Sequence, residues 1–276
     1  MPEGVATYPR WYGTLSGPPA WAVIAGQEIR KTWLGFWGRV VILLALGWSL
    51  VQVANLYTLT QGRSPSTIHT VDNFLSFLHL ISWASLGVAA VMSGPALLED
   101  ARRGALELYL ARSITTREYL AGKVVAVFGL SAAVFIACAA IYWLGAMMVV
   151  GTQPANWSTI ILPAAAYGLV WALVVSGVGL GVSSVARSSV AAALLLFGGF
   201  AIGDLLVSDL FASVTNSDAA KLLSPFAAME QQRTWLFSAK APFNFPDWWG
   251  AVELLVLIGV GWALVAWKHP RIKGEE

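Results

Sequence analysis

The residues best placed to do chemistry in this 276-residue chain form one charged stretch, 99–123, between two long apolar runs. Its ionised side chains are Glu99, Asp100, Arg102, Arg103, Glu107, Arg112, Arg117, Glu118 and Lys123. A charged side chain at the centre of a bilayer costs about 2.5–3.5 kcal/mol on insertion scales, so this stretch belongs in water or among lipid headgroups. Charges of both signs at this density can bind a soluble partner or headgroups.

The same stretch has helical periodicity over its first half. Its apolar stripe consists of Leu98, Ala101, Ala105, Leu108 and Tyr109, and Asp100, Arg103 and Glu107 fall on the opposite face. This spacing is typical of an amphipathic helix, which could rest on a membrane bundle and present its charges to a partner. A solvated connecting loop accounts for the charges equally well.

Catalytic motifs are absent from the sequence. Gly122-Lys123 is followed by Val124 and has no glycine five positions before it, so the chain lacks the G-x-x-x-x-G-K-[ST] loop that cradles ATP phosphates. The three histidines, His69, His79 and His269, fit no metal-ligand spacing. We therefore predict no catalytic residue and no metal site on this chain.

Composition identifies an integral membrane protein. Hydrophobic residue types make up 57% of the chain and charged ones only 12%, against roughly a quarter charged in soluble domains. A net charge of +2 without a basic, aromatic stripe excludes nucleic-acid binding. The single cysteine, Cys138, lies in an apolar run and is interpreted as a packing residue.

Six apolar runs reach or exceed the roughly 20 residues that a membrane-spanning helix needs. They cover about 40–59, 74–98, 124–150, 159–185, 190–211 and 248–267. Most of the 17 Lys and Arg residues fall in segments on the side of the N-terminus, and only Arg63, Lys221, Arg233 and Lys240 fall on the other. The positive-inside rule therefore predicts that both termini and the 99–123 stretch are cytoplasmic, with the N-terminus retained.

Two further elements are expected outside the spans. Residues of about 20–37 alternate apolar and polar types at helical spacing and predict an interfacial helix, although an ordinary juxtamembrane segment fits nearly as well. The outer connection 212–247 is too long for an empty loop. Ser224-Pro225 is a helix-start pair, which predicts one short helix from Phe226 to Phe237.

Small and ionisable residues within the spans are the remaining candidates. Gly177 with Gly181 and Gly199 with Gly203 have the spacing that lets helices pack closely, within one chain or between two. Asp204 and Glu253 are the carboxylates expected at membrane depth. They could contact substrate, or face a solvated outer vestibule.

The charged stretch resembles the first cytoplasmic loop of type-two ATP-binding-cassette (ABC) exporter permeases. The resemblance lies in the order Glu99, Gly104-Ala105-Leu106-Glu107-Leu108-Tyr109-Leu110, Arg117, Leu120 and Gly122-Lys123. Ala105 stands where the family usually has Thr, and Ser113 where it usually has Pro. Thr115 with Glu118 three residues later still predicts a capping box that opens a new helix.

The resemblance implies a fold and a function. The fold is all-α, a single permease domain over 1–276 with six transmembrane helices, an N-terminal elbow helix whose Glu28-Ile29-Arg30 is similar to that of the family, a cytoplasmic coupling helix, and an outer helical hairpin or lid before the last span. The function is that of the permease subunit of an ATP-driven exporter, a dimer in the plasma membrane of a prokaryotic cell.

The same resemblance suggests roles for particular residues. The residues expected to dock a separate cytoplasmic ATPase, which would hold ATP and Mg, are Glu99, Arg102, Arg103, Glu107 and Arg117. Gly199 and Gly203 are candidate contacts with a second permease copy or a paralogue, and Asp204 and Glu253 are candidates for the substrate pathway. Membrane lipids are the other expected partner. Two alternatives stay open: a non-ABC lipid-handling enzyme or scaffold, and a family permease devoted to cofactor or metalloenzyme assembly.

Overall fold

The structure, a computed structural model, is almost entirely helical over the residues that it describes. These are residues 18–61, 70–102, 114–150, 154–205, 210, 212–215, 221, 224–237, 243, 246 and 248–272. Within these ranges there is no β-strand, so the predicted all-α fold is confirmed.

Five of the described helices are long and apolar enough to cross a membrane. They are α2 (Phe36–Thr60), α3 (Thr70–Ala96), α6 (Thr116–Val150), α7 (Pro154–Val185) and α12 (Trp248–Ile272). The run expected to span over 190–211 is the shorter helix α8 (Ser189–Ile202), which continues in wider turns to Leu205. The count of six spans stays a prediction.

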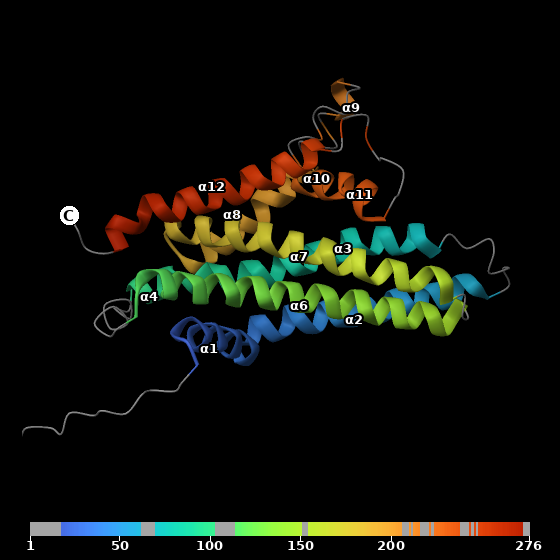
Figure 1. Ribbon diagram of the computed structural model, residues 1–276, viewed down its shortest axis with the longest axis horizontal. Helices are drawn as coiled ribbons and strands as arrows, with labels where there is room; N and C mark the ends of the chain where they lie inside the picture. The colour runs from blue at the N-terminus through green and yellow to red at the C-terminus, as the bar shows by residue number, and fades with distance from the viewer. Residues whose placement is uncertain are drawn as a thin grey trace, which may run out of the picture.

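The bundle is built around α3. This helix contacts α2, α6, α7 and α8, while α12 packs mainly on α7 (Figure 1). Because α3 is surrounded, a larger share of it is buried than of α2 or α12, which lie at the edge of the bundle with large apolar side chains exposed. Exposed apolar side chains are what a lipid environment requires of the outer helices.

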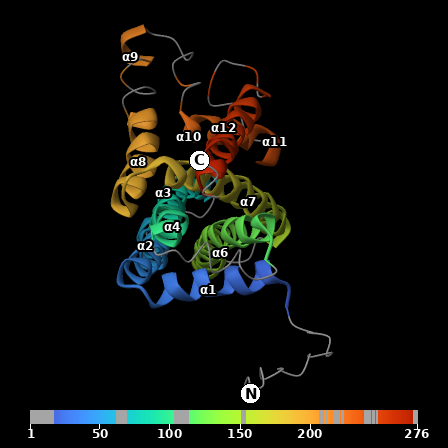
Figure 2. The same ribbon diagram turned by 90° about the vertical axis from the view of Figure 1, so that its left-hand side faces the viewer.

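A short helix crosses one end of the bundle. The helix expected at 20–37 is α1 (Ala20–Leu34), which lies across the ends of α2 and α6 (Figure 2). It ends at Gly35, whose extended backbone directs the chain into α2 and whose N–H donates to the Lys31 carbonyl at 2.9 Å. The same end holds α4 (Leu98–Arg102), the start of α6 and the C-terminal end of α12 (Figure 1).

The predicted capping box at the start of α6 is confirmed. The Glu118 carboxylate accepts from the Thr115 backbone N–H and from its hydroxyl, both at 2.9 Å, and the Thr115 hydroxyl accepts from the Glu118 N–H at 3.2 Å. These bonds satisfy backbone donors that have no partner inside the helix. Most of the expected coupling helix, residues 103–113, lies outside the described residues.

The described part of the segment before α12 contains the short helices α9 (Ala212–Thr215), α10 (Pro225–Gln231) and α11 (Arg233–Phe237). Of these, α10 packs on α12 and α11 on α7, whereas α9 projects away from the bundle (Figure 1). The single helix expected over 226–237 is divided at Gln232, which forms a turn. Ser224 caps α10 as expected, and α10 is buried against α12, with Phe226 and Met229 at most 1% exposed.

The small residues of α7 allow α12 to approach closely. A Cβ placed on Gly181 would lie 2.7 Å from Gly261 Cα of α12, and one on Gly177 would meet Ile258 at 3.7 Å. The Gly177–Gly181 spacing therefore serves packing within the chain. Close backbone approach adds van der Waals contacts, which hold helices together where lipid offers no hydrophobic drive.

Gly181→Ala is expected to destabilise the bundle. The added methyl must push α7 and α12 apart, and overpacking of this kind costs about 1–3 kcal/mol. The measurement is the midpoint of thermal unfolding of the purified chain in detergent. Gly129→Ala in α6 is the matched control, since a Cβ there meets nothing within 4 Å; equal midpoints for the two variants would contradict the packing role.

Candidate functional site

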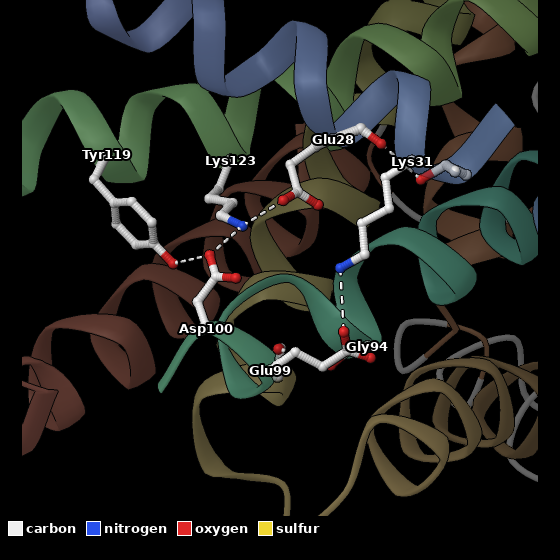
Figure 3. Close-up of polar contacts among 9 residues, drawn as sticks. Glu28, Lys31, Gly94, Glu99, Asp100, Tyr119 and Lys123 are labelled. Atoms are coloured by element: carbon white, nitrogen blue, oxygen red, sulfur yellow. Dashed lines mark hydrogen bonds and ion pairs between the residues drawn. The ribbon is translucent and has the colours of Figure 1, made fainter. Parts of the chain in front are cut away.

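A buried lysine marks the end of the bundle at which α1 lies. The Lys123 side chain, in the second turn of α6, is only 2% exposed. Its Nζ lies 2.7 Å from Glu28 Oε1 of α1 and 2.6 Å from Asp100 Oδ2 of α4 (Figure 3). One ammonium group thus joins three elements that are far apart in the sequence.

The two carboxylates are what make this burial tolerable. An isolated buried ammonium loses several kcal/mol of hydration, and only close, well-oriented opposite charges can offset that loss. Asp100 Oδ2 also accepts a hydrogen bond from the Tyr119 hydroxyl at 2.8 Å, which fixes the carboxylate between the two side chains (Figure 3). We call Glu28, Asp100, Tyr119 and Lys123 the polar junction.

Gly122 allows α1 to reach the polar junction. A Cβ at this position would lie 2.8 Å from both the Trp21 carbonyl oxygen and Ile24 Cβ of α1. Any larger residue would move α1 away from α6. The adjacent Gly122-Lys123 pair therefore provides both the close approach and the charge that binds Glu28.

Two further contacts connect the charged stretch to its surroundings. Lys31 Nζ lies 3.1 Å from Glu99 Oε2, an ion pair at the surface (Figure 3). The Arg102 guanidinium donates to the Arg187 carbonyl oxygen in the turn between α7 and α8. Through these contacts, a displacement of α4 would also move α1, α6 and the α7–α8 turn.

The residues expected to dock an ATPase have different surroundings. Glu99 and Arg102 make the contacts just described, and Arg117 is exposed in the first turn of α6. Arg103 and Glu107 lie outside the described residues. The structure thus brings Glu99, Arg102 and Arg117 to the same end of the bundle. Glu99 and Arg102 belong to α4, and Arg117 belongs to the start of α6.

Sequence reasoning missed the polar junction as a site. A lysine directly before a long apolar run was a usable signal, because burial of its charge demands a partner. The partners themselves, 95 residues away for Glu28, could not be identified without the fold.

The candidate dimer residues lie on α8. A Cβ at Gly199 would meet nothing within 4 Å, and this residue is exposed. Gly203 ends the regular part of α8 with a right-handed helical backbone. Gly199 therefore takes no part in close packing with the described residues of its own chain.

The candidate pathway carboxylates lie near the C-terminal end of α8 and the N-terminal end of α12. Asp204 Oδ1 accepts from the Ser224 hydroxyl at 2.9 Å, so it holds the residue that caps α10. Glu253, in the second turn of α12, is partly buried, and its Oε2 has no hydrogen-bond partner among the described residues. Asp204 thus has a structural contact, whereas Glu253 Oε2 has none among the described residues.

Aromatic and ionic contacts hold α10 in place. The Phe226 ring lies 4.2 Å from Trp83 and 4.8 Å from Trp171, measured between ring centroids. Glu230 Oε1 lies 3.1 Å from both His79 Nδ1 and an Arg233 guanidinium nitrogen. Burial alone would raise the pKa of Glu230, but the bond to His79 and the Arg233 charge outweigh it, and the pKa is lowered from 4.5.

An apolar groove of about 520 Å³ runs between α2, α3 and α8. Its lining includes Leu44, Trp48, Leu80, Trp83, Gly87 and Phe197.

Within the described ranges there is no group of three His, Cys, Asp or Glu residues that could hold a metal ion.

One comparison with known proteins gives a match. The family model described as ABC-2 family transporter protein matches residues 86–269, which include α4, the polar junction except Glu28, and everything from α6 to most of α12. No curated protein matches the chain.

Lys123→Met is expected to destabilise the chain by about 3 kcal/mol, because it leaves Glu28 and Asp100 as uncompensated, largely buried carboxylates. The measurement is thermal unfolding in detergent. The triple variant Glu28→Gln, Asp100→Asn, Lys123→Met should recover part of the loss. Lys31→Met removes a surface pair and should cost no more than about 1 kcal/mol; equal losses for the two single variants would refute the role of burial.

Acidification should loosen α10. The lowered pKa of Glu230 means that its interactions stabilise the fold fully above the unfolded value of 4.5 and are lost as pH falls through the folded value. Unfolding midpoints should therefore drop on acidification below about pH 4.5, and Glu230→Gln should reduce the drop. An identical pH profile in this variant would contradict the assignment.

Proposed function

The chain belongs to the ABC-2 family of transporter proteins, and on that premise we propose that it is the membrane permease of an ATP-driven exporter whose ATPase is a separate cytoplasmic subunit. ATP and Mg would be bound by that subunit, since this sequence has no P-loop. The observation that carries the proposal is the polar junction, which ties the charged 99–123 stretch to α1 and α6.

Coupling would work through the covalent and ionic connections of this stretch. The stretch joins α3 to α6 directly. Within it, Asp100 binds Lys123, and Glu99 binds Lys31 of α1. A rigid-body movement of the ATPases against the loop would therefore move α3, α6 and α1 together. A flexible, unanchored loop could absorb the same movement without passing it on.

Two permease copies, or one copy and a paralogue, would form the substrate pathway between them. The groove between α2, α3 and α8 is apolar and open to the side of the bundle, and Gly199 presents a flat surface on the same helix, α8. Gly199 and Gly203 are the proposed contacts, with Asp204 and Glu253 toward the outer end of the pathway. An apolar lining suits an amphipathic or lipid-like cargo better than a free ion.

The end of the bundle that holds α1 is the proposed cytoplasmic end. It also holds α4, the α7–α8 turn and the end of α12. Together with α1 and the rest of the 99–123 stretch, these segments contain most of the Lys and Arg residues of the chain. The positive-inside rule places them in the cytoplasm, with both termini, in the plasma membrane of a prokaryotic cell. The family match removes the non-ABC alternative, while a permease devoted to cofactor or metalloenzyme assembly would share all these features.

Charge reversal in the loop tests ATPase docking. Arg103→Glu with Glu107→Lys should sharply reduce both co-purification with a P-loop ATPase encoded by an adjacent reading frame and ATP-dependent transport in vesicles. The physical reason is that like charges would then face each other across the interface. Membrane insertion should be unchanged.

The matched control is Arg30→Glu, a reversal of an exposed charge on α1 outside the loop. It should leave ATPase binding within about twofold of the wild type, the effect of an ordinary surface charge. Docking through the 99–123 stretch would be refuted if the loop variant bound the ATPase as well as this control does.

A further inference from the structure

A second polar site lies at the opposite end of the bundle from the polar junction. A half-open pocket of about 180 Å³ is formed by the C-terminal part of α2, the N-terminal part of α3 and the C-terminal part of α6. Polar and aromatic side chains dominate its lining: Gln52, Asn55, Asn73, Ser76, Phe77 and Tyr142. Such a concentration of amides is unusual in helices that are otherwise apolar.

The helical spacing directs these polar groups to one place. Gln52 and Asn55 are three residues apart on α2, and so are Asn73 and Ser76 on α3, so each pair occupies one face of its helix. The Asn55 amide donates to Gln52 Oε1 at 3.2 Å, which orders the α2 pair. Asn55, Asn73 and Ser76 are exposed, so they form the mouth of the pocket.

The base of the pocket is aromatic. Phe77 and Tyr142 are each 3% exposed, and their rings stack with centroids 4.5 Å apart and planes at 19°. Stacking between α3 and α6 keeps this surface rigid. The pocket therefore combines an apolar floor with a rim of groups that both donate and accept hydrogen bonds.

The chemistry of the lining selects the class of ligand. None of the eight residues that the structure describes around the pocket is acidic or basic, so these residues offer a phosphate or an ammonium no counter-charge for the hydration it would lose. Hydroxyl groups both donate and accept, as side-chain amides do, so a polyhydroxylated group matches the amide rim. The volume is below the roughly 300–1,000 Å³ of pockets for drug-sized ligands, so it suits one small group.

We propose that this pocket binds an uncharged, polyhydroxylated group of the size of a single sugar. Two sources share this chemistry: the headgroup of a glycolipid whose chains remain in the bilayer, and a free carbohydrate. The site is separate from the apolar groove and from the polar junction, and its occupancy does not depend on ATP or on an ATPase subunit.

The test measures which lipids the full chain retains. The chain is purified in a sugar-free amine-oxide detergent, offered equal amounts of glucosyl diacylglycerol and phosphatidylcholine, and analysed by native mass spectrometry. A parallel sample receives methyl glucoside as a competitor. The variants are Asn73→Leu and Ser76→Val at the mouth, with Gln27→Leu, an exposed amide on α1, as the control.

The expected result is preferential retention of the glucosyl lipid, reduced about 2- to 10-fold by each of the two mouth variants and unchanged in Gln27→Leu, in line with the loss of one net hydrogen bond. Displacement by methyl glucoside would support the site and identify free carbohydrate as a sufficient ligand; failure to displace would support the lipid-bound source. Equal retention of the two lipids by the wild type, or no effect of the mouth variants, would overturn the proposal.

Discussion

Burial of one ammonium group organises the end of this protein where the charged stretch begins. Lys123 enters the bundle at the start of a helix that is otherwise apolar, and its charge is tolerable only because Glu28 and Asp100 lie within 2.7 Å. These partners come from α1 and α4, so the need to neutralise the buried charge also fixes where α1 and α4 lie relative to α6. If α1, α4 or the start of α6 moved away from the others, buried charges would lose their partners.

Deeper in the bundle, close packing of backbones holds the helices together in place of ion pairs. Between α7 and α12 the glycines at 181 and 261 let two backbones meet, and at Gly122 the same device brings α1 against α6. The open glycine at 199 is the contrast, because no described residue of its own chain fills the space beside it. The same glycine spacing therefore marks close packing in α7 and an exposed glycine in α8. Only the helices that lie beside each position show which of the two applies.

The region around α10 is held by a different set of interactions. Here α10 enters the bundle with Phe226 among aromatic rings, while Asp204 holds its cap and Arg233 donates to the Leu75 carbonyl at 2.9 Å. These contacts give α10 and α11 a fixed place against α3 and α12. The polar pocket near Asn73 is also lined by α3, so the same central helix supports both features.

Composition and spacings of a few residues were enough to predict the membrane class, the all-α fold, the charged stretch and the capping box at Thr115 and Glu118. The sequence also located α1 and the start of α10 within a few residues. Three contacts emerge only from the folded chain: Lys123 pairs with Glu28, Gly181 packs within the chain, and Asp204 holds the cap of α10. Each of these depends on which residues meet across gaps of tens of positions, and helical periodicity states only which face a residue occupies, not which helix lies against it.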